Sequence, residues 1–60
     1  MAAVDTFEWY IAPFLKGGNE RIVRRIGELR AQLLTLRSED ERQRYVDSAM
    51  EELRALSSAA

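Results

Sequence analysis

The sequence predicts an all-α protein: an antiparallel helical hairpin that follows a short aromatic N-terminal helix and dimerises into a helical bundle. Two apolar seams with helical spacing, joined by only two residues, predict the hairpin. The length predicts the dimer, because a single domain of 60 residues buries too little apolar surface to be stable easily. Within this one domain, 1–60, the expected elements are an aromatic segment at 5–16, helices at 19–37 and 38–56, and a frayed tail at 57–60.

The aromatic segment combines a helix start with a helix breaker. Asp5 is a good N-cap residue and begins a capping-box pattern. Pro13 lacks a backbone N–H, so we expect a helix to about Ala12 and then a kink or a separate turn. Gly17 and Gly18 mark the end, because glycine readily adopts the left-handed conformation of a helix C-cap.

The middle helix carries the clearest pattern. Asn19 is a favourable N-cap residue, and apolar residues follow it at spacings of 4, 3, 4 and 3. Such spacing is typical of a helix that packs lengthwise on another helix. The residues of this seam are Ile22, Ile26, Leu29, Leu33 and Leu36.

The last helix begins with a capping box, in which Glu41 follows Ser38 by three residues. Its seam has spacings of 3, 4 and 3. The middle helix has a local charge of +3 and the last one −3, which favours their pairing, although each exposed ion pair contributes only about 0–1 kcal/mol. The seam consists of Val46, Ala49, Leu53 and Leu56.

Composition narrows the possible functions. The chain has neither cysteine nor histidine, so it lacks disulfides, the usual zinc ligands and the commonest general base. Its net charge of −1 gives no overall attraction to nucleic acid. The longest apolar run, seven residues, falls far short of the roughly 20 that span a bilayer. We expect a cytoplasmic protein that is not an enzyme and holds no metal or cofactor.

Four of the five aromatic residues lie in the first segment, which makes it the candidate binding element. Large aromatic side chains dominate interface hot spots. Three arrangements are open: the segment packs on the core of its own chain, crosses to a second copy, or inserts into a groove on another protein. The expected anchors are Trp9, Tyr10, Phe14 and Leu15, together with Phe7.

A second apolar line on the middle helix predicts a further contact surface. Val23, Gly27, Ala31 and Leu34 lie about 100° from the main seam. Gly27 costs the helix about 1 kcal/mol relative to alanine, and its small size permits close approach of another backbone. This line either receives the aromatic segment or binds a partner.

The preferred function is a small adaptor, inhibitor or assembly factor that docks helical apolar surface on a larger protein. Peripheral membrane binding through the aromatic segment is one alternative. Weak nucleic-acid binding through Arg21, Arg24 and Arg25 is the other. The predicted partner-binding residues are Phe7, Trp9, Tyr10, Phe14, Leu15, Val23, Arg24, Gly27 and Leu34.

Overall fold

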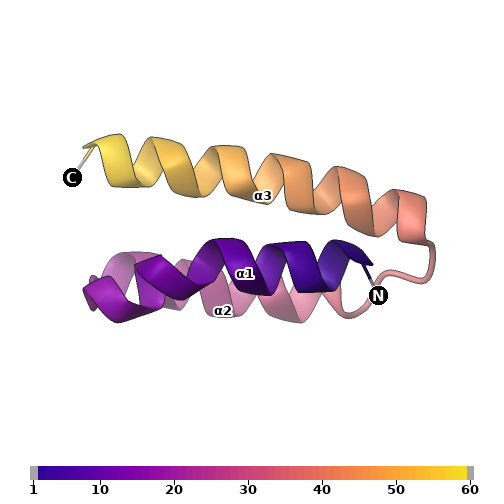
Figure 1. Ribbon diagram of the computed structural model, residues 1–60, viewed down its shortest axis with the longest axis horizontal. Helices are drawn as coiled ribbons and strands as arrows, with labels where there is room; N and C mark the ends of the chain where they lie inside the picture. The colour runs from indigo at the N-terminus through magenta and orange to yellow at the C-terminus, as the bar shows by residue number, and fades with distance from the viewer. Residues whose placement is uncertain (1, 60) are drawn as a thin grey trace.

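The computed structural model describes residues 2–59, which form three α-helices and no strand. Helix α1 spans Ala2–Gly17, α2 spans Glu20–Leu33 and α3 spans Glu39–Ala59. All three pack against one another along the 32 Å length of the molecule, and the chain ends lie at opposite ends of it (Figure 1). The prediction of an all-α protein is confirmed.

Helix α1 is longer than the sequence predicts, because it continues through Pro13 without a break. Pro13 is exposed, so its ring lies on the outside of the bundle, away from the core. The residue removes the N–H that would bond the carbonyl of Trp9, but the exposed position lets water reach that carbonyl. The helix ends where expected, at Gly17, and Gly18 takes the left-handed conformation with φ of +73°.

Helix α2 ends at Leu33, four residues before the predicted end at 37. The backbone N–H of Thr35 bonds the carbonyl of Gln32 at 3.1 Å, and that of Leu36 bonds the carbonyl of Leu33 at 3.2 Å. These bonds span three residues and so tighten and close the last turn. The Thr35 hydroxyl also donates to the Gln32 carbonyl at 2.6 Å, which occupies an acceptor that a longer helix needs.

The starts of α2 and α3 follow the predicted caps, but the start of α1 does not. Helix α1 begins at Ala2, three residues before the predicted cap, so Asp5 lies within its first turn, where a carboxylate still favours the positive end of the helix dipole. The Asn19 side chain accepts a hydrogen bond of 3.2 Å from the Ile22 N–H, and the Ser38 hydroxyl accepts a long one of 3.5 Å from the Glu41 N–H. Helix α3 continues to Ala59, so residues 57–59 of the predicted tail are helical, and position 60 lies outside the described residues.

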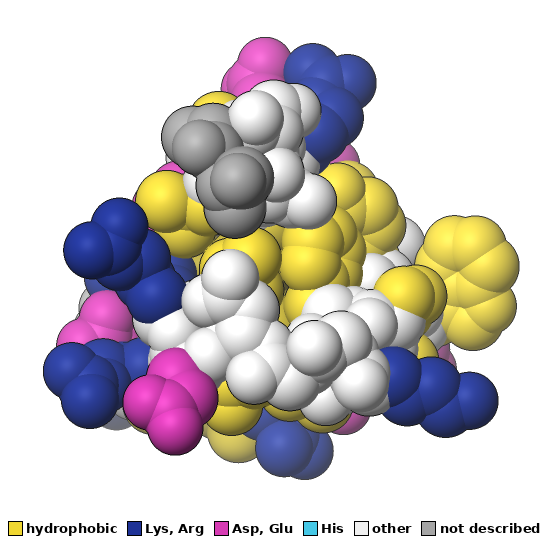
Figure 2. Space-filling view, turned by 90° about the vertical axis from the view of Figure 1, so that its left-hand side faces the viewer, with side chains coloured by type: hydrophobic (Ala, Val, Ile, Leu, Met, Phe, Trp, Pro, Cys, Tyr) yellow, Lys and Arg dark blue, Asp and Glu magenta, His cyan; other side chains and the backbone are white. Residues whose placement is uncertain are grey.

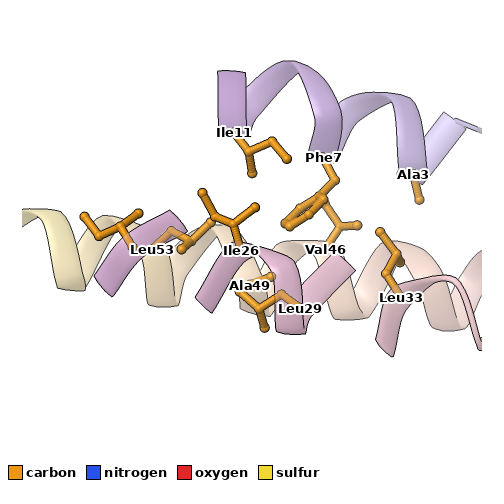
Figure 3. Packing of buried hydrophobic residues seen from close by; sticks show 10 residues of the cluster. Ala3, Phe7, Ile11, Ile26, Leu29, Leu33, Val46, Ala49 and Leu53 are labelled. Atoms are coloured by element: carbon orange, nitrogen blue, oxygen red, sulfur yellow. The ribbon is translucent and has the colours of Figure 1, made fainter. Parts of the chain in front are cut away.

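The core lies between all three helices, as Figure 3 shows for the side chains that point toward one another from each of them. Helix α1 therefore packs on its own chain, one of the three arrangements left open by the sequence. The predicted seam residues that lie in α2 and α3 are buried, except Leu56, which is half-buried. Leu36, also half-buried, lies in the connector after α2. Among residues 2–59, the helices include none with an apolar stretch of the length that a bilayer span requires. The buried residues are Ala3, Phe7, Ile11, Ile22, Ile26, Leu29, Leu33, Val46, Ala49 and Leu53.

Candidate protein-docking surface

The indole of Trp9 is the most exposed large hydrophobic side chain among the described residues, with 80% of its surface accessible to solvent. Its neighbour in the aromatic segment, Phe7, is 1% exposed. Two residues of an α-helix are rotated by about 200°, so the two rings leave α1 on opposite sides. The continuous helix thus divides the aromatic segment into a core face and a surface face.

Around Trp9 the surface of α1 is shallowly hollowed. The hollow, called here the Trp9 surface, is lined by Trp9, Tyr10, Ala12, Pro13, Phe14 and Lys16. The rings of Tyr10 and Phe14 pack at a centroid distance of 5.4 Å, and the Tyr10 hydroxyl donates a hydrogen bond of 3.3 Å to the Met50 carbonyl. The side of the hollow formed by Tyr10 and Phe14 is therefore fixed to α3, whereas the side formed by Trp9 is exposed.

Two smaller hollows adjoin the Trp9 surface. One shares Tyr10 and continues over Asp47, Met50, Glu51 and Arg54 of α3. The other shares Pro13 and Phe14 and lies at the end of the bundle. Figure 2 looks at that end, where hydrophobic side chains are visible between the helices, one projects at the right-hand edge, and Lys and Arg side chains surround them. Apolar surface bordered by charged side chains is typical of a protein-binding site.

The second predicted contact line forms a separate surface on α2. Leu34 is 56% exposed, Val23 is half-buried, and a Cβ atom added to Gly27 would meet no atom within 4 Å. The aromatic segment therefore does not cover this line at its centre. Leu15, another predicted binding residue, is 46% exposed but lies on α1 and not on this α2 surface.

The predicted basic cluster is divided by ion pairing. Arg25 donates two hydrogen bonds to the Glu52 carboxylate on α3, the one from Nη2 measuring 3.1 Å, and bonds Glu28 at 3.1 Å. The bonds to Glu52 raise the pKa of the Arg25 guanidinium and lower the pKa of the Glu52 carboxyl. Of the three arginines of this cluster, Arg21 and Arg24 are exposed and form no ion pair within residues 2–59.

Charge also joins α1 to α2. Arg30 Nε lies 2.7 Å from Glu8 Oε1, so this arginine of α2 pairs with α1. Within residues 2–59, no three acidic side chains come together in a group that could hold a metal ion.

The structure brings together three predicted binding residues, Trp9, Tyr10 and Phe14, and separates the others from them. Phe7 lies in the core and has no surface to offer a partner in this fold. Sequence reasoning missed Ala12 and Lys16, which belong to the Trp9 surface. Their spacing could have indicated this. Ala12 and Lys16 follow Trp9 by three and seven residues, which places them on the same side of a continuous helix as Trp9.

No protein-family model, curated protein or solved structure matches this chain.

Proposed function

We propose that the chain is a non-catalytic protein interaction module that docks the Trp9 surface on a larger protein. The exposure of Trp9 carries this proposal. A tryptophan side chain buries roughly 150–250 Å² when it is covered, and such residues are common anchors of protein interfaces. The hollow beside the indole gives a partner side chain a place to pack against Pro13 and Phe14.

A protein partner is favoured over nucleic acid by the ion pairs. Because Arg25 is engaged with Glu52 and Glu28, only two arginines of the cluster are available for phosphate contacts. Two contacts supply little affinity at physiological salt, since the strength of such binding grows with the number of phosphates neutralised.

We also infer that α2 and α3 form the antiparallel hairpin expected from the sequence. The pairing of Arg25 with Glu52, and the short connector at 34–38, support this arrangement. Dimerisation is likewise part of the proposal, because the exposed apolar side chains lie on more than one face.

In the test, the immobilised chain is exposed to a cell extract and the proteins that it retains are identified. Two variants of the chain are then compared with wild type for retention of the same protein. Trp9→Ala is expected to abolish retention of the bound protein, at a cost of at least about 2 kcal/mol, as for an interface hot spot. Arg44→Ala is the control, because it removes an exposed side chain of α3 that belongs neither to the Trp9 surface nor to the predicted partner-binding residues. Equal retention by wild type and Trp9→Ala, with helicity preserved in circular dichroism, would contradict the proposal.

Lipid vesicles test the alternative that the Trp9 surface binds a membrane and not a protein. The chain contains a single tryptophan, so its fluorescence reports on Trp9 alone. A blue shift on adding anionic vesicles would show that the indole enters the lipid interface and would favour peripheral membrane binding instead.

A further inference from the structure

The outer side of α1 carries a second line of residues at helical spacing. Asp5, Trp9, Ala12 and Lys16 follow one another at intervals of 4, 3 and 4, and all four are exposed. These intervals resemble those of the seam by which helices of coiled coils pair. Trp9 is 80% exposed, so the line faces outward.

The order of residues along this line is self-complementary. An acid stands at its N-terminal end, a base at its C-terminal end, and between them a large side chain precedes a small one. If a second helix of the same sequence runs antiparallel, one register places Asp5 against Lys16 and Trp9 against Ala12 at the same time. Two-fold symmetry then repeats both contacts.

We propose that the outer face of α1 binds a second copy of this chain in this antiparallel register. The indole of each copy packs on Ala12 of the other, in the hollow bounded by Pro13 and Lys16. Alanine leaves room for the ring, whereas a large residue at 12 would hold the helices apart. The two indoles supply the apolar area, and the charges at the ends select the register.

Charge complementarity is what identifies a second copy as the occupant. Asp5 also has an interaction within its own chain, and the contact with Lys16 of the second copy would be additional to it. Lys16 is exposed and has no ion pair in the described part of the chain. A parallel copy would set like charges opposite each other and indole against indole, so the antiparallel arrangement is favoured.

This pairing goes beyond the docking proposed above, because it needs no larger protein. If both take place they compete, since each covers Trp9. The dimer would then cover the Trp9 surface, and dissociation would expose it to a larger protein.

Sedimentation of charge-reversed variants tests the register. Asp5→Lys gives a chain with lysine at both ends of the line, and Lys16→Asp gives one with aspartate at both ends. Each variant alone sets like charges together twice, so its dimer dissociation constant should rise roughly tenfold or more, equal to about 1.4 kcal/mol or more. An equimolar mixture restores both opposite-charge contacts and should form a heterodimer.

Two controls accompany the mixture. Arg44→Asp changes an exposed charge on α3, outside the line, and should leave the dimer unaffected. Trp9→Ala should abolish the dimer, and wild-type Trp9 fluorescence should shift to the blue as the protein concentration rises. Circular dichroism of each variant establishes that the helices are retained.

A wild-type chain that is monomeric throughout the micromolar range would overturn the proposal. A wild-type dimer whose single variants remain dimeric, or whose mixture gains nothing over them, would also overturn it. A monomeric chain would also contradict the dimerisation included in the proposed function. Capture of a larger protein through the Trp9 surface is measured separately, so the failure of this pairing is distinguishable from the failure of that docking.

Discussion

The backbone N–H of Ala3 in α1 donates a hydrogen bond of 2.9 Å to the carboxylate of Glu39 in α3. First-turn N–H groups of a helix have no partner within that helix, so a side chain from another helix caps α1 here. Arg42 Nε bonds the same carboxylate at 3.1 Å, and Arg42 Nη1 bonds the Leu36 carbonyl at 2.8 Å. This network fixes the first turn of α1 to the start of α3 and to the connector that precedes it.

The network predicts that acid destabilises the fold. The hydrogen bond from Ala3, and then that from Arg42, lower the pKa of Glu39 in the folded chain. The unfolded chain therefore binds more protons in the window between that lowered pKa and the usual value of about 4.3. The contribution of Glu39 is complete above the usual value and is lost as pH falls through the folded one; Glu52, bonded by Arg25, acts in the same direction.

Thermal unfolding followed by circular dichroism from neutral to acid pH measures this dependence. Glu39→Gln cannot ionise, so it should be less stable than wild type at neutral pH and lose less stability on acidification. A variant whose stability falls with pH as steeply as that of wild type would show that Glu39 does not carry the effect.

Gly27→Ala should stabilise the chain by about 1 kcal/mol, because alanine is the better helix former and the added methyl group meets no atom within 4 Å. Gly27 does not have a positive φ, so no backbone strain opposes the change. Urea unfolding measures the difference. If the α2 surface approaches a partner closely, the same variant should bind that partner more weakly despite its greater stability; unchanged or lower stability would contradict the structural reading.

The seams of α2 and α3 could be predicted from the sequence because their spacing records directly which side is buried. The role of α1 could not, because Pro13 predicts a break in the helix, and without a continuous helix the aromatic residues around it do not separate into two faces. With the helix continued, Ala3, Phe7 and Ile11 fall on one side and Trp9 on the other. The low helix propensity of proline does not end α1 here, because three buried side chains hold the helix against the other two.

The early end of α2 depended on a different cause. The connector turns through hydrogen bonds to the Gln32 and Leu33 carbonyls, and an arginine from α3 bonds the Leu36 carbonyl. The pattern of apolar residues cannot predict this bond, because Arg42 is a charged residue six positions after Leu36. Spacing therefore predicts the buried side of a helix better than it predicts the last turn.

Pro13→Ala should stabilise α1. Proline in a helix interior is less favourable than alanine by about 3 kcal/mol, and the substitution gives the Trp9 carbonyl its intrahelical donor. The observed gain should be below that limit, because Pro13 is exposed and a carbonyl that water can reach loses less when its intrahelical donor is missing. Far-UV circular dichroism during urea unfolding measures it. Destabilisation would show that the proline ring contributes packing that its exposure does not suggest.

Phe7→Ala and Trp9→Ala should change the stability of the chain by very different amounts, although both remove an aromatic ring from the same helix. Loss of the buried Phe7 ring should cost about 3–5 kcal/mol, which is comparable to what a core of this size supplies, and leave the chain largely unfolded. Loss of the exposed Trp9 ring should change the stability of the monomer by no more than about 0.5 kcal/mol.

Far-UV circular dichroism in urea at low protein concentration compares the two variants. The low concentration is essential, because a dimer held by Trp9 makes the apparent stability depend on concentration, and that dependence should vanish in Trp9→Ala. A large loss of stability in the Trp9 variant at every concentration would mean that the indole packs on its own chain. That result would remove the observation on which both proposed interactions rest.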